Sequence, residues 1–167
     1  MKSLVSLIAL GLALGSSSIA AEPSPMAVLD FWAGHCWKGT FPDGSTIDEH
    51  CFTWVYAQKA MRDRHVVKAP GRPDYIGETV YFWDSEAKSI AYVYYENLGG
   101  VGRGTAQATA EGLAFPDGHY SGGGQVMNYR ASWKKQEGAY EAVNEAKKGD
   151  GWAPMWDITY RQSGPAS

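Results

Sequence analysis

Apolar and polar residues alternate in short runs along most of the chain, from Cys36 to Gln162. Side chains alternate between the two faces of a β-strand, so this pattern predicts strands with one buried and one solvated face. Glycine, proline and aspartate separate the runs and leave no room for crossover helices. Beyond a first hairpin, strands are expected at 59–68, 74–83, 88–96, 103–110, 125–135, 139–147 and 152–162. A short helical turn is expected at 26–33, and turns at 116–118 and 121–124.

The N-terminus carries the three parts of a secretory signal peptide, which we place at residues 1–20. Lys2 provides the positive charge, residues 4–14 are mostly apolar, and small residues follow. We expect cleavage after Ala20, with Ala21 as the second choice. The alternative, a transmembrane anchor, fits less well because the apolar run is shorter than the roughly 20 residues that a bilayer span needs.

Composition narrows the class of protein. The formal net charge is −3 without a run of basic residues, so no nucleic-acid partner is expected. The 20 glycines, 10 tyrosines and 7 tryptophans suit a β-protein. No second apolar span follows the signal peptide, so no transmembrane segment is expected in the mature protein. We expect a short spacer at 21–25 and a single periplasmic or secreted domain at 26–163.

The first two strands fix their own register. In an exported protein, Cys36 and Cys51 are expected to form a disulfide. If they face each other, Lys38 faces Glu49, and a four-residue loop that contains the turn sequence 42–44 remains. The turn and the cysteines therefore agree on one register. A redox or metal-binding cysteine pair is the alternative, but the chain has neither a Cys-x-x-Cys motif nor a third cysteine.

The same reasoning extends to the strand at 59–68. If Ala57 and Gln58 form a two-residue turn, His65 lies opposite His50, and Asp63 joins the inner face while its arginine neighbours face water. Alanine and glutamine are poor residues for such a turn, and a slip of one residue would invert the two faces.

Three segments carry a resemblance to known barrels: Phe31-Trp32-Ala33-Gly34, the strand 62–67, and Gly77-Glu78-Thr79 followed by Tyr81 and Trp83-Asp84. The entry resembles that of calycins, the superfamily of lipocalins, fatty-acid-binding proteins and nitrobindin. More closely, the chain resembles a bacterial domain-of-unknown-function family of conserved hypothetical exported proteins. The pattern itself predicts about nine or ten strands with short connections, which close into an up-and-down barrel or fold into a sandwich. The resemblance implies the barrel, with a cavity for one small ligand. The chain departs from lipocalins in having Gly34-x-x-Trp37 instead of Gly-x-Trp.

Five titratable residues form the most interesting candidate set: His35, Asp48, His50, Asp63 and His65. All five are expected to face inward on neighbouring strands. Imidazole and carboxylate groups in this pattern can bind a metal, or act as an acid/base pair. They can also form a hydrogen-bonded polar row that fixes the register of the barrel, which we favour. We expect neither a metal nor another cofactor.

The aromatic residues provide the second candidate set, either as ordinary core or as the wall of a ligand pocket. The expected ligand contacts are His50, His65, Asp63, Trp37, Trp54, Tyr81, Trp83 and Arg103. Arg103 would meet an anionic group of the ligand. The expected function is binding of a small, partly apolar ligand inside the barrel. The alternatives are a small-substrate enzyme that uses the His/Asp row, and an envelope interaction module with a filled barrel, so enzymatic activity stays an open question.

Overall fold

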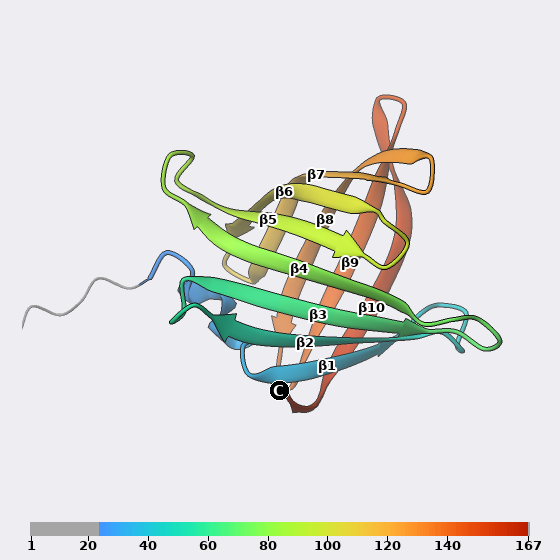
Figure 1. Ribbon diagram of the computed structural model, residues 1–167, viewed down its shortest axis with the longest axis horizontal. Coiled ribbons are helices and arrows are strands. Elements are labelled where there is room, and N and C mark those ends of the chain that lie inside the picture. Colours follow the sequence, from blue (N-terminus) through green and yellow to red (C-terminus); the bar gives the residue numbers. More distant parts are fainter. Residues whose placement is uncertain (1–23, 167) are drawn as a thin grey trace, which may run out of the picture.

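Each alternating segment pairs with its neighbours in sequence, and the last strand closes onto the first (Figure 1). The computed structural model describes residues 24–166, so the expected signal peptide lies outside the described residues. The result is a closed antiparallel barrel in the order β1-β10-β9-β8-β7-β6-β5-β4-β3-β2. The elements are η1 (Ala27–Phe31), β1 (His35–Thr40), β2 (Ile47–Val55), β3 (Ala60–Lys68), β4 (Tyr75–Asp84), β5 (Ser89–Glu96), β6 (Val101–Ala108), β7 (Gly112–Gly122), β8 (Gln125–Gln136), β9 (Ala139–Lys148) and β10 (Gly151–Pro165). The all-β barrel prediction is therefore confirmed.

The predicted register of the first hairpin is confirmed. Cys36 pairs with Cys51, and the two are joined by a disulfide. Lys38 faces Glu49, and its Nζ lies 3.3 Å from the carboxylate. The Asp43 carboxylate orders the turn by accepting hydrogen bonds from the backbone N–H groups of Ser45 and Thr46, both at 2.8 Å.

The register between β2 and β3 is confirmed as well, with His50 directly opposite His65. The turn between these strands keeps this register although it lacks glycine and asparagine. Tyr56, Ala57 and Gln58 all adopt positive φ angles, at 52°, 52° and 64°. These residues thus adopt the backbone conformation that a tight hairpin requires.

Residues 116–118 differ from the prediction, because they do not form a turn between strands. They lie inside β7, where the register with β8 shifts between Phe115 and Gly118. Pro116 has no N–H to give to the ladder, so the strand bulges there and continues. The Asp117 carboxylate accepts hydrogen bonds from the backbone N–H and the hydroxyl of Thr105 on β6, both at 2.8 Å. The strand β7 was therefore missed because its bulge resembles a turn in sequence.

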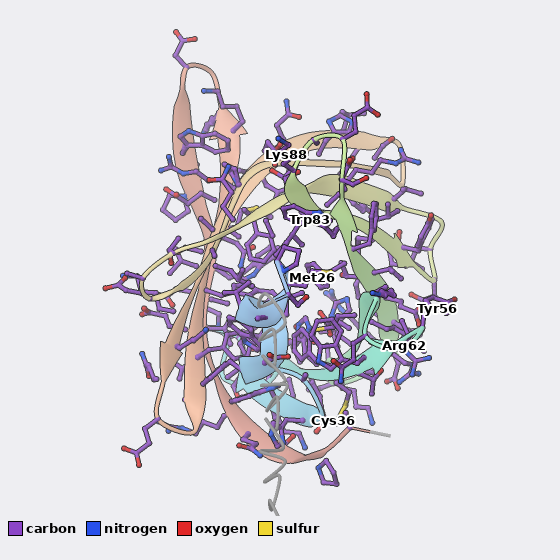
Figure 2. All side chains as sticks on the ribbon, turned by 90° about the vertical axis from the view of Figure 1, so that its left-hand side faces the viewer. Met26, Cys36, Tyr56, Arg62, Trp83 and Lys88 are labelled. Carbon is purple, nitrogen blue, oxygen red and sulfur yellow. A yellow bond between two sulfur atoms is a disulfide. The ribbon has the colours of Figure 1, made fainter. Side chains whose placement is uncertain are left out.

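The element η1 closes one end of the barrel. Figure 2 views this end, and shows η1 and Met26 within the ring of strands. Trp32 is fully buried there, and its carbonyl accepts a hydrogen bond from Trp37 Nε1 at 3.3 Å. Trp54 Nε1 donates to the Asp30 carboxylate at 3.2 Å. The predicted helical turn is thus a short 3-10 helix that serves as the floor of the barrel.

Among residues 24–166, no helix is long and apolar enough to cross a membrane.

Removal of the disulfide should lower the free energy of unfolding. The bond closes a loop with a sequence separation of 15, and chain-entropy arguments give about 3 kcal/mol for a loop of that size. Urea unfolding of a double variant with Cys36→Ala and Cys51→Ala should show this loss. A reductant should produce the same loss in the unmodified protein and none in the variant. A loss well under about 1 kcal/mol would contradict the expectation.

Candidate functional site

A cavity of about 490 Å³ lies inside the barrel. Its size is within the range of small-molecule sites, and its wall is mostly aromatic. The aromatic lining consists of Phe41, Tyr75, Tyr81, Tyr92, Tyr94, Phe115, Tyr120, Tyr129, Trp133, Tyr140, Trp156 and Tyr160. Its polar lining consists of Asp48, His50, Asp63, His65, Thr79 and Asn144. A filled barrel does not fit this interior.

Glycines on neighbouring strands make room for the cavity's tyrosines. A Cβ placed on Gly104 would lie 2.5 Å from the Tyr92 hydroxyl, and one placed on Gly118 would overlap the Tyr129 ring. Gly77 does the same for Tyr94. Each ring can therefore lie close to the wall instead of filling the interior. The ring covers the backbone of the neighbouring glycine, which has no side chain of its own. The inward glycines thus help to keep the barrel hollow.

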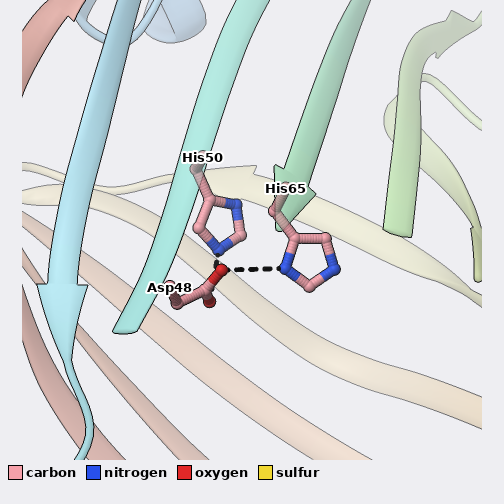
Figure 3. Close-up of side chains that lie close together, drawn as sticks. All are labelled: Asp48, His50 and His65. Carbon is pink, nitrogen blue, oxygen red and sulfur yellow. Dashed lines mark hydrogen bonds and ion pairs between the residues drawn. The ribbon is translucent and has the colours of Figure 1, made fainter. Parts of the chain in front are cut away.

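One wall of the cavity carries a continuous hydrogen-bonded row of titratable side chains from β2 and β3. His50 Nδ1 lies 2.8 and 3.0 Å from the two carboxylate oxygens of Asp63, and His50 Nε2 lies 3.0 Å from Asp48. Asp48 also faces Nδ1 of His65 at 3.1 Å, and Figure 3 shows both imidazoles directed at this carboxylate. The Tyr160 hydroxyl of β10 donates to Asp48 at 2.9 Å and ties the row to the far end of the chain.

Two tyrosine hydroxyls extend the row across the next strands. His65 Nε2 lies 3.1 Å from the hydroxyl of Tyr94, which lies 2.5 Å from the hydroxyl of Tyr75. With His65 neutral, Tyr75 donates to Tyr94, Tyr94 donates to His65, and His65 donates to Asp48. Every hydrogen bond in the row is then satisfied.

His50 is an imidazolium in this arrangement, because both of its ring nitrogens face carboxylates and only an N–H can donate to them. Burial alone would lower the pKa of His50, but the negative charges of Asp48 and Asp63 outweigh it and raise that pKa well above its ordinary value. Burial would likewise raise the pKa of Asp48, but His50 and His65 lower it strongly. The centre of the row is therefore a buried ion cluster.

The tyrosine hydroxyls of the cavity stay neutral. Burial raises the pKa of Tyr75 to about 12. Burial also raises the pKa values of Tyr92, Tyr94 and Tyr160. These hydroxyls can donate or accept hydrogen bonds, but none supplies a phenolate at neutral pH.

Asp48, His50 and His65 could together hold a metal ion, since each offers a ligand atom and these atoms lie within 4.8 Å of one another. Imidazole nitrogen and carboxylate oxygen are suitable donors for Zn²⁺. The same atoms already pair with one another, however, and a metal would have to displace the protons of both histidines.

The structure divides the sequence-predicted ligand contacts into three groups. His50, His65, Asp63 and Tyr81 line the cavity together. Trp37 and Trp54 do not line it, and instead hydrogen-bond to Trp32 and Asp30 of the floor. Trp83 is 37% exposed near the end of β4, and Arg103 is exposed on β6.

His35 does not join the polar row, contrary to the prediction. It lies at the start of β1, where Gln162 Nε2 donates to its Nδ1 at 2.8 Å. Sequence reasoning also missed Tyr75, Tyr94 and Tyr160 as members of the row. Alternation placed Tyr160 on one face of the last strand, and a closed barrel places that strand against β1, but no sequence signal gave the register that brings Tyr160 to Asp48.

Comparisons with known proteins leave the family open. No family model matches the chain, and a search of curated proteins finds no similar sequence. The fold agrees with the barrel that the resemblance implied, whereas membership of the domain-of-unknown-function family stays a prediction.

Substitution of Gly118 by alanine should destabilise the protein, because the new methyl group would overlap the Tyr129 ring. Overpacking of this kind costs about 1–3 kcal/mol. Gly164→Ala is the matched control, since a Cβ there meets nothing within 4 Å. Urea unfolding of both variants tests the claim, and equal stability of the two would contradict it.

Stability should fall as the pH rises above neutrality. The unfolded chain releases the His50 proton near pH 6.5 while the folded protein keeps it, so the stabilisation is complete below about pH 6.5 and is lost as the pH rises through the raised folded pKa. Between about pH 7 and pH 9 the free energy of unfolding should drop by up to about 1.4 kcal/mol per pH unit.

Denaturation midpoints measured across this range test the effect. His50→Gln should flatten the slope, whereas His119→Gln, at an exposed histidine on β7, should leave it unchanged. A steep slope that persists in His50→Gln would show that another group is responsible.

Proposed function

We propose that this protein binds a small, partly apolar ligand inside its barrel. The observation that carries the proposal is the cavity of about 490 Å³, aromatic on most sides and polar along one wall. Small-molecule sites combine mainly apolar walls with a few fixed polar groups that orient the ligand. The row from Asp63 to Tyr75 supplies such groups, and its hydrogen bonds hold them in place before a ligand arrives.

Acid/base catalysis has less support. A general base needs a free lone pair near its substrate, but both nitrogens of His50 are engaged by carboxylates. Both nitrogens of His65 are engaged as well, by Asp48 and Tyr94. The hydrogen bonds of the row therefore hold its protons in fixed positions, which favours ligand binding over proton transfer.

We also propose that the protein is exported and that residues 1–20 are removed as a signal peptide. The disulfide between Cys36 and Cys51 supports this proposal, because such bonds persist in oxidising compartments such as the periplasm or the extracellular medium. The mature chain would begin at Ala21, which the mass of the protein purified from its native envelope would test.

Filling the cavity should abolish binding without unfolding the barrel. Ala131 lines the cavity on β8, and Ala131→Trp would place an indole there. We expect the neutral dye N-phenyl-1-naphthylamine to gain fluorescence with the unmodified protein, and to bind at least about tenfold more weakly to this variant. The matched control is Ala87→Trp in the exposed turn after β4. Equal dye binding by both variants would place the dye outside the cavity and contradict the proposal.

A further inference from the structure

We propose that Asp48, His50 and His65 form a binding site for a divalent transition-metal ion, with Zn²⁺ as the ion to be tested. The proposal goes beyond the ligand binding proposed above and does not depend on it. It also differs from the expectation drawn from the sequence, in which no metal was expected. The sequence placed the two histidines opposite each other, but only the structure shows that one nitrogen of each is directed at the same carboxylate.

Three donor atoms of the types that bind zinc converge on one part of the cavity wall. His50 Nε2 and His65 Nδ1 lie 3.0 and 3.1 Å from the two carboxylate oxygens of Asp48, and each of the three residues offers a ligand atom within 4.8 Å of the others (Figure 3). Donors bound to zinc at about 2.0–2.1 Å lie about 3.3 Å from one another in a tetrahedral site. The distance from each imidazole to the carboxylate is therefore close to the one that zinc requires.

The three side chains can be reached from the cavity. The side chains of His50 and His65 are 13% and 12% exposed, that of Asp48 is 6% exposed, and all three residues line the cavity. Structural zinc sites use four protein ligands, whereas catalytic zinc sites use three and leave one position open. With three protein ligands on the wall, the open position faces the cavity. A water molecule or a donor atom of the cavity's ligand can occupy it.

The groups behind the three donors hold them in place. A histidine that binds a metal almost always donates its second N–H to an acceptor, which orients the ring. The second nitrogen of His50 lies 2.8 Å from Asp63, and that of His65 lies 3.1 Å from the Tyr94 hydroxyl. The Tyr160 hydroxyl donates to Asp48 at 2.9 Å. Each of the three residues thus has the outer contact that is typical of a metal ligand.

Metal binding moves protons in the row but leaves the hydrogen bonds behind the site satisfied. Zinc takes the place of the proton on His50 Nε2, which passes to the solvent. The proton of His65 moves from Nδ1 to Nε2 and is donated to Tyr94, and Tyr94 then donates to Tyr75. This order of donors is the reverse of the one in the metal-free protein. The paired row is therefore the metal-free form of the same site.

Few other groups compete for a transition metal. Both cysteines are joined in the disulfide. The other two histidines of the chain, His35 and His119, hydrogen-bond to Gln162 and Asn128 on the outer parts of the barrel. Within residues 24–166, Asp48, His50 and His65 are the one group of three such donors close enough to share an ion. His35 and His119 can therefore serve as controls.

Zinc binding by the full mature protein tests the proposal. The protein is stripped of metal with EDTA, dialysed, and titrated with ZnCl₂ by isothermal titration calorimetry at neutral pH. We expect one Zn²⁺ per chain, bound at least about a hundredfold more tightly than Mg²⁺ or Ca²⁺, because those two ions prefer oxygen ligands. Absence of zinc binding, or equal binding of the three ions, would overturn the proposal.

Variants then locate the ion. His50→Gln and His65→Gln should each weaken zinc binding at least about a hundredfold, since each removes an imidazole ligand. His35→Gln and His119→Gln are the matched controls and should bind zinc within about twofold of the unmodified protein. Zinc binding that persists in both His50→Gln and His65→Gln, or that is lost in a control, would place the ion elsewhere and overturn the proposal.

X-ray absorption spectroscopy of the zinc-loaded, unmodified protein gives a test that does not depend on the folding of any variant. We expect nitrogen and oxygen donors at about 2.0–2.1 Å, with the scattering pattern of two imidazoles. A first coordination shell without imidazole would overturn the proposal. The proposed function is tested separately by N-phenyl-1-naphthylamine. Failure of zinc binding with intact dye binding would therefore overturn the metal site alone, and the opposite result would overturn the proposed function alone.

Discussion

The structure depends on one buried imidazolium held between two carboxylates. His50 lies between Asp63 and Asp48, so β2 and β3 can pair only in the register that places these three groups together. A slip of β3 by one residue would turn Asp63 to the solvent face, away from His50, and send its neighbours inward. Through Tyr160, the same Asp48 carboxylate also binds β10, the strand that closes the barrel against β1. A single charge cluster therefore links register, closure and the polar wall of the cavity.

The interior is hollow because glycines on the inner wall of the barrel leave room for tyrosine rings to lie against that wall. Most β-proteins fill their core with branched side chains, but this barrel places glycines such as Gly104 and Gly118 beside the rings of Tyr92 and Tyr129. Those rings lie against the wall and leave the centre free. The floor is supplied separately by η1, with Trp32 buried beneath the cavity. The packed end and the open interior are thus built by different residues, which allows a stable fold around an unfilled space.

Much of the fold could be predicted from the sequence because its pairings are local. The cysteines and the turn at 42–44 gave the first register, and it led to His50 facing His65 through a turn that lacks the usual residues. The candidate site was predicted only in part. The hydrogen bond from Tyr160 to Asp48 joins residues 112 positions apart, and alternation within one strand carries no information about such partners. The bulge at Pro116 was mistaken for a turn because proline, aspartate and glycine favour both.

The position of the charge cluster is itself informative about function. Buried ion pairs add little to stability, and well-packed apolar residues often replace them without loss. Fixing the register of two strands therefore does not require four titratable groups, since apolar alternation does so in most barrels. Here the groups line a cavity instead of lying within a packed core. The free-energy cost of burying these four groups is therefore better explained by a role inside the cavity than by a role in stabilising the fold.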